Sequence, residues 1–293
     1  MFLLKIKLGR NKFVIKNKKS KLIILLIVSF SVISLASPFT LAQGILVRPF
    51  SLKVHKPQDK TITKKLEIEN NTGKAVPITM KVSEFTTEQG KLKVQENNPA
   101  ESGLADRISL SQTDFSIEAN STETIEVNVK PPEGNSRGPE WGCVEILTAP
   151  IAESKGGVGI RFRFIIEVLQ FDDRITDRQA KIESMSAKVS NPDDEKSKPS
   201  VTVTTKFGNV SKKILQPELR FQVRSGSGKE VASKEISDWV LPGKSKNFSA
   251  TFPAKKWKPG QYLAVVIADY GGSQRAGGQY VFEIPEKKQK ESS

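Results

Sequence analysis

Three short patterns in the sequence are similar to motifs that carry chemistry. The first, Gly-Asn-Ser-Arg-Gly at residues 134–138, matches G-x-S-x-G, the turn that presents the nucleophilic serine of many hydrolases. That turn needs a strand before the serine, a helix after it and a histidine later in the chain. Here prolines flank a loop that contains the serine, and the only histidine, His55, precedes it. The pattern therefore does not predict a serine hydrolase.

The other two patterns fail on spacing. Gly-Lys-Ser at residues 243–245 matches the end of a phosphate-binding loop, but the glycine required five residues before Gly243 is Asp238. The three consecutive acids at residues 193–195 lack the ligand spacing of a calcium site and indicate a solvated loop. Asp172 and Asp173 are given the same interpretation.

Soft metal ligands are scarce, because the chain has one histidine and one cysteine. Zinc sites need more of them, so we predict no metal site. Because no catalytic constellation supports an enzyme, we also predict no cofactor and no enzymatic activity. Cys143 cannot form an internal disulfide. It lies in a strand-like stretch with Val144 and Ile146, where a small apolar filler is the expected role.

The formal charge of +14 is concentrated at the N-terminus. Eight lysines and arginines and no acids lie in residues 1–42, so the rest of the chain carries 14 − 8 = +6. A basic lead followed by an apolar run at residues 22–36 predicts a signal peptide, cut after Ala42 or after Ala36. An uncleaved membrane anchor is the alternative. We expect an exported protein of the periplasm or cell envelope that binds no nucleic acid.

From Gly44 onward, short alternating segments rich in β-branched residues are separated by turn residues. Such spacing is typical of an all-β sandwich, and it predicts two immunoglobulin-like domains in series, at residues 43–172 and 179–285. Residues 171–178 are interpreted as the junction, and residues 286–293 as a disordered tail. The strands expected in the first domain lie at residues 45–54, 61–69, 76–85, 91–95, 114–118, 122–129, 141–148 and 158–169. Those expected in the second lie at residues 179–189, 200–207, 217–223, 230–236, 246–252, 260–269 and 279–284.

The last strand of the first domain is unusual. Apolar side chains recur at every second position, with Arg161 and Arg163 between them, which indicates one apolar and one basic face. From residue 164 to 166 the alternation becomes an apolar run, so the strand is expected to enter a core covered on both sides. Its apolar side chains either complete the domain or are offered to a partner by strand addition. They are Val158, Ile160, Phe162 and Phe164.

Several segments resemble the N-terminal domain of periplasmic pilus-assembly chaperones, the PapD-like family. They are the strand ending in asparagine at residues 66–70 (Leu-Glu-Ile-Glu-Asn), residues 76–78, residues 115–118, and the aromatic strand running to a proline at residues 141–150. The strand at residues 158–168 then takes the place of the family's long donor strand.

This resemblance implies a chaperone that lends a strand to a protein subunit with an incomplete β-sandwich. Val158, Ile160, Phe162 and Phe164 would fill the groove of that subunit. By the same resemblance, Lys53 and Arg163 would hold its C-terminal carboxylate, with Arg48 and Arg161 as competing assignments. The alternative is a structural or adhesive module of the cell envelope in which the long strand is fully paired.

Overall fold

The computed structural model describes residues 7–8, 11–12, 44–57, 59–88, 90–95, 103–134, 136–151, 159–190 and 199–286. Two short strands, β1 (Lys7–Leu8) and β2 (Asn11–Lys12), pair with each other in an N-terminal unit, Met1–Gly44. Apart from them, the predicted signal segment lies outside the described residues. The other described strands belong to a second unit, Ile45–Ser293. Within the described ranges, no helix is long and apolar enough to cross a membrane.

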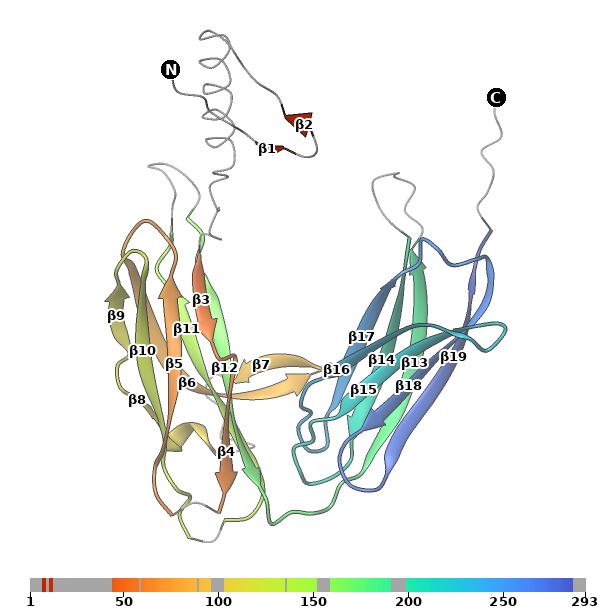
Figure 1. Cartoon of the computed structure of the whole chain (residues 1–293). Coiled ribbons are helices and arrows are strands. Elements are labelled where there is room, and N and C mark those ends of the chain that lie inside the picture. Colours follow the sequence, from red (N-terminus) through yellow and green to blue (C-terminus); the bar gives the residue numbers. More distant parts are fainter. Residues whose placement is uncertain are drawn as a thin grey trace. The chain divides into compact units, whose positions relative to one another are not determined.

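The first sandwich is built from two sheets (Figure 1). One sheet has the order β3-β5-β10-β8 and the other the order β4-β12-β11-β6-β7, with β9 paired to β6. All pairs are antiparallel except β4 and β12, which run parallel. A single turn of 3-10 helix, η1 (Ala105–Arg107), precedes β8. The strands are β3 (Ile45–Arg48), β4 (Ser51–Lys56), β5 (Ile62–Asn70), β6 (Val76–Glu88), β7 (Lys91–Gln95), β8 (Ile108–Leu110), β9 (Asp114–Ile117), β10 (Ser121–Val129), β11 (Glu140–Thr148) and β12 (Arg163–Asp172).

The second sandwich packs the sheet β13-β14-β17 against the sheet β16-β15-β18-β19. Every pair of strands in these two sheets is antiparallel. The all-β fold with two immunoglobulin-like sandwiches is the predicted one. Its strands are β13 (Ala180–Ser190), β14 (Ser200–Asn209), β15 (Glu218–Ser225), β16 (Glu230–Ser237), β17 (Ser245–Pro253), β18 (Gly260–Asp269) and β19 (Arg275–Ile284).

Period-two alternation explains both cores, because alternate side chains of a strand point to opposite faces of its sheet. In β5 and β10 the buried positions recur at every second residue, including Leu66, Ile68, Ile125 and Val127, and these side chains meet those of the opposite sheet. The second core is formed in the same way around Phe207, Phe221 and Phe248. Burial of these side chains supplies the main stabilisation of a chain with one cysteine.

The first predicted strand is in fact two. The segment expected at residues 45–54 pairs with β5 up to Arg48, changes sheet, and pairs with β12 from Ser51 onward. The change occurs at Pro49, which has no N–H to donate to a neighbouring strand. The sequence also did not predict β8, and β12 begins at Arg163, later than expected.

The strand β12 is covered on both faces in its second half, as predicted. Ile166 and Val168 lie in the sandwich core, whereas Leu169 and Phe171 lie in a separate apolar cluster on the other face. That cluster also contains Phe85 and Trp141 of the first sandwich, and Ile214, Trp239 and Leu241 of the chain beyond it. Cys143 belongs to the same cluster, where burial raises its pKa to about 12, so its role as an apolar filler is confirmed.

Each sandwich contains one buried asparagine that makes an equivalent set of hydrogen bonds. Asn70 ends β5 and Asn209 ends β14, and both side chains are excluded from solvent. Each side-chain oxygen accepts hydrogen bonds from the main chain and hydroxyl of the residue two positions on, Thr72 or Ser211. Each side-chain amide donates to three main-chain carbonyls, those of Lys74, Ile117 and Glu118 around Asn70, and those of Lys213, Val240 and Leu241 around Asn209.

Candidate functional site

Over the first half of β12, one side of the strand has no neighbour among the strands that the structure describes. The main-chain N–H of Thr148 donates to the carbonyl of Phe162, so even-numbered residues of this stretch direct their backbone groups toward β11. Odd-numbered residues direct theirs the opposite way, where β4 pairs with β12 only from Glu167 onward. Among the described strands, none pairs with this side of residues 161–166. We call this stretch the open edge.

An apolar row runs along the open edge and leaves the sandwich core as it does so. Ile166 is fully buried, Phe164 is half-buried against the core, and Phe162 stacks on Phe164 with ring centroids 6.1 Å apart. Ile160 is 57% exposed. Ile160, Phe162 and Phe164 are three of the four predicted groove-filling residues, and the structure places them on one face of the strand. The fourth, Val158, lies outside the described residues.

Phe50 marks the end of the open edge. Its carbonyl accepts a hydrogen bond of 3.3 Å from the main-chain N–H of Glu167, the first contact between this side of β12 and the β4 segment. Its side chain is 62% exposed, the largest exposed fraction among the large apolar residues that the structure describes. A strand added to the open edge would therefore end beside an exposed phenylalanine. The sequence analysis did not single out this residue.

Arg163 is held by a buried acid. Its Nε donates to Glu145 Oε2 over 2.9 Å and its Nη2 donates to the same oxygen. The Glu145 side chain is fully buried and also accepts hydrogen bonds from Ser83 and Lys81. Burial alone would raise the pKa of Glu145, but these hydrogen bonds lower it overall. The guanidinium of Arg163 is thus already paired.

The structure does not bring Lys53 and Arg163 together. Lys53 lies beside Leu169 in the parallel pair of β4 and β12, six residues further along β12 than Arg163. At about 3.3 Å per residue, the two positions are roughly 20 Å apart along the strand. Lys53 Nζ donates to Gln216 Oε1 over 2.8 Å, and the competing candidate Arg48 pairs with Glu69. In this structure the two cations therefore contact different partners and do not converge on one point.

An acid, Glu167, lies where the open edge ends. Burial raises the pKa of Glu167 to about 7, and the charge of Asp238 acts in the same direction. The charge of Lys246 and a hydrogen bond with Trp239 oppose this rise. Near neutral pH the side chain is thus close to half-protonated.

Replacing Glu167 with glutamine is expected to remove a loss of folding stability that grows as pH rises. Because the folded-state pKa is above the unfolded value, the folded protein binds more protons between about pH 4.5 and pH 7, and stability falls as pH rises through this window. Glu167→Gln should therefore be more stable than the parent at pH 8, by at most about 3 kcal/mol, and similar to it at pH 4. Urea denaturation at both pH values measures this difference. The exposed Glu283→Gln is the control, and a variant that is no more stable than the parent at pH 8 contradicts the assignment.

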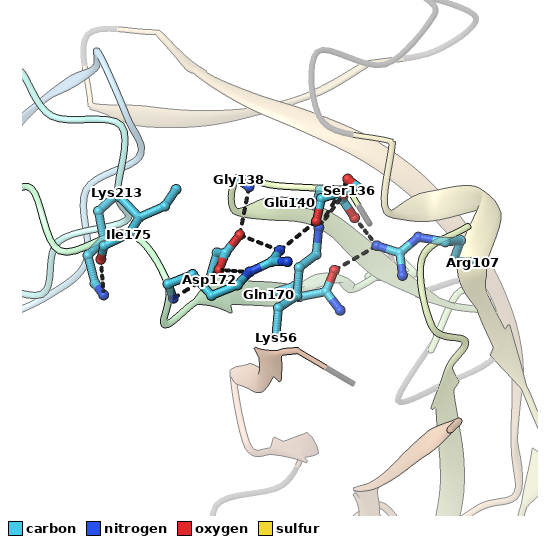
Figure 2. A network of polar contacts seen from close by, with 10 residues as sticks. Lys56, Arg107, Ser136, Gly138, Glu140, Gln170, Asp172, Ile175 and Lys213 are labelled. Atoms are coloured by element: carbon cyan, nitrogen blue, oxygen red, sulfur yellow. Dashed lines mark hydrogen bonds and ion pairs between the residues drawn. The ribbon is translucent and has the colours of Figure 1, made fainter. Parts of the chain in front are cut away.

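A buried polar network lies at the other end of β12, where β4, β11 and β12 meet (Figure 2). Lys56 Nζ donates to Glu140 Oε1 over 2.7 Å, and Arg107 Nη2 donates to Glu140 Oε2 and to Gln170. The Lys56 side chain is completely excluded from solvent. Burial lowers the pKa of Lys56 to about 8, and the neighbouring charge of Arg107 contributes. This network joins β4, η1, β11 and β12, which are distant from one another in the sequence.

The same network fixes the chain as it leaves β12. Asp172 accepts hydrogen bonds from the Arg174 guanidinium and from the main-chain N–H of Gly138, and these keep its pKa well below the usual range. Asp172 is 1% exposed, so its interpretation as a solvated loop residue was wrong. The predicted junction, residues 171–178, is anchored by the ion pair of Asp172 with Arg174 and by a hydrogen bond from Lys213 to the carbonyl of Ile175.

Ser136, the serine of the G-x-S-x-G pattern, belongs to this network. Its hydroxyl donates to Glu140 over 3.1 Å and lies 3.5 Å from Lys56 Nζ, and its carbonyl accepts from Arg174. The residues around it form a loop between β10 and β11, without the helix that a nucleophile turn requires. Among the described residues, no three His, Cys, Asp or Glu side chains gather as a metal site.

The network had one detectable signal in the sequence. In β4 the buried side chains alternate as Leu52, Val54 and Lys56, so a lysine occupies a position that faces inward. A charged side chain at such a position requires a buried partner. The identity of that partner depends on contacts distant in the sequence, and the alternation alone does not provide it.

No family model matches the chain, and no curated protein matches it in sequence. Solved structures match it at low identity. The chaperone of the Csu pili of Acinetobacter baumannii, in a complex with a tip adhesion subunit, is 11% identical over 84% of this chain and 100% of its own, with a TM-score of 0.41. The CupB2 chaperone of Pseudomonas aeruginosa is 13% identical over 82% and 100%, with a TM-score of 0.38. The DraB chaperone of E. coli is 13% identical over 83% and 98%, with a TM-score of 0.38. All three are structures of chaperones, and at these identities the likeness concerns the fold alone.

Proposed function

We propose that this chain is a non-enzymatic binding protein that captures a partner protein by strand addition along the open edge of β12. Backbone N–H and C=O groups of the odd-numbered residues 161–165 face away from β11 and would pair with the added strand. Ile160, Phe162 and Phe164 would provide the apolar contacts. A surface-fibre subunit with an incomplete β-sandwich is the class of partner that we propose, and export to the periplasm or envelope is the matching location.

The observation that carries the proposal is the contrast between the two halves of β12. From Glu167 to Gln170 the strand is paired on both sides, with β11 and with β4. Before Glu167 it is paired with one described strand only, β11, and its apolar row becomes more exposed toward Ile160. An unpaired, apolar strand edge promotes aggregation unless something covers it. The alternative of an envelope module with a fully paired long strand does not account for this edge.

Replacing Phe162 with aspartate is expected to abolish capture while leaving the first sandwich folded. Phe162 lies in the apolar row between the half-buried Phe164 and the exposed Ile160, so a charge there disrupts the surface offered to a partner more than the core. The measurement is a tag-based pull-down of the full chain from the envelope fraction, followed by mass spectrometry and, separately, a thermal melt.

The matched control for this experiment is Val281→Asp, at an exposed apolar residue of β19. It should retain the partner. A Phe162→Asp variant that fails to fold would show that Phe162 is ordinary core and would remove the proposal. A folded Phe162→Asp variant that still captures its partner would also contradict the proposal. A direct role of Lys53 or Arg163 in binding stays a prediction.

A further inference from the structure

The open edge carries a cation on the face opposite the apolar row. Arg161 lies between Ile160 and Phe162, so its side chain points to the other face of the strand. It is exposed, and within the described ranges no acid pairs with it. Arg163, on the same face, differs because the buried Glu145 already holds its guanidinium. The first half of the open edge therefore presents a guanidinium that no described acid holds, beside an apolar surface.

A strand paired with this edge would meet the two faces separately. Residues directly opposite each other on paired strands share a face and have Cβ atoms about 5 Å apart. Residues opposite Ile160 and Phe162 would thus contact the apolar row, and the residue between them would face Arg161. Opposite charges at such a position are favourable and like charges are unfavourable, and a guanidinium can bind a carboxylate through two hydrogen bonds.

We propose that the partner segment is an alternating strand that carries an aspartate or glutamate opposite Arg161, between two apolar residues. This inference rests on the proposed function and specifies the chemistry of the partner at that site. The open edge also limits the length of the segment, because β4 occupies the edge from Glu167 and the exposed Phe50 stands at the boundary. The partner is thereby selected by charge as well as by apolar pattern.

The test uses synthetic strand peptides of alternating valine and threonine, with glutamate, glutamine or lysine at the centre. A centre-symmetric sequence places the charged residue opposite Arg161 in either strand direction, and N-methylation of one edge prevents self-association. Binding to the full chain is measured by fluorescence anisotropy. The glutamate peptide is expected to bind about five- to tenfold more tightly than the lysine peptide.

Arg161→Glu should reverse this preference. Because Arg161 is exposed and unpaired among the described residues, the variant should keep the parent melting temperature. Arg220→Glu, at an exposed position of β15, changes the net charge equally and should keep the parent preference. Phe162→Asp should lower the affinity for all three peptides, and this result would locate their binding at the open edge.

The outcomes separate the two proposals. If all three peptides bind equally well and lose binding in Phe162→Asp, strand addition holds and the charge selection by Arg161 is overturned. If the preference persists in Arg161→Glu, another residue is responsible and the inference fails. If no peptide binds the parent protein, both the proposed function and the inference are removed.

Discussion

Replacing Glu140 with glutamine is expected to lower the free energy of unfolding by about 3–5 kcal/mol at pH 7. The Glu140 carboxylate neutralises two cations at once, Lys56 over 2.7 Å and Arg107 through its other oxygen. The Lys56 ammonium is fully buried, so it has no access to water when its partner is lost. A neutral amide leaves two neighbouring positive charges in the interior. Urea denaturation followed by tryptophan fluorescence measures the change.

The pH dependence of this effect identifies its cause. The pKa of Lys56 is lowered to about 8 in the folded protein, below its unfolded value of about 10.4, so Lys56 is charged at pH 7 and neutral well above pH 8. The cost of Glu140→Gln should therefore be greatest below pH 8 and smaller near pH 9.5. The exposed Glu126→Gln should change stability by less than about 0.5 kcal/mol. A loss under about 1 kcal/mol in Glu140→Gln would contradict the account.

Replacing either Asn70 or Asn209 with alanine is expected to cost about 3 kcal/mol. Each substitution removes the donor for three carbonyls and the acceptor for a main-chain N–H, all in a site closed to solvent. A buried polar group left without its partner costs about 1–3 kcal/mol. Amide hydrogen exchange measures the loss locally, at the ends of β5 and β14.

Asn128→Ala provides the matched control for both variants. Asn128 lies on β10 and accepts one exposed hydrogen bond from Thr63, so its loss should cost less than about 1 kcal/mol. Equal protection in the parent and in Asn70→Ala would show that water replaces the asparagine amide. That result would also contradict the prediction that Asn70 and Asn209 contribute equally to stability.

Most strands were predictable because one face of each is buried and the other is exposed to solvent. In β5 and β10 the apolar residues fall at every second position, and the predicted ranges differ from the observed ones by one residue or so. The switch from β3 to β4 was not predictable in this way. Alternation reports which face is buried and does not report which sheet a strand joins, so one continuous segment was expected where the chain changes partners after Arg48.

The candidate site was predictable in part. The apolar row at Ile160, Phe162 and Phe164 follows from alternation, since a strand that leaves its core keeps its period. The basic pair did not follow, because the parallel register of β4 on β12 places Lys53 beside Leu169. Nor did the pairing of Arg163, which depends on Glu145 of a neighbouring strand. Such partners are set by pairing between strands, which local sequence does not specify.

The two buried asparagines have a consequence for producing the protein in other hosts. Asn70-Asn71-Thr72 and Asn209-Val210-Ser211 both match N-x-[ST], the acceptor pattern for N-linked glycosylation. The hydroxyl that completes each pattern is the group that bonds to the asparagine oxygen in the folded chain. A eukaryotic secretory pathway modifies surface asparagines with a bulky glycan, and neither side chain has room for one. In such a host, glycan attachment and completion of each sandwich would exclude one another.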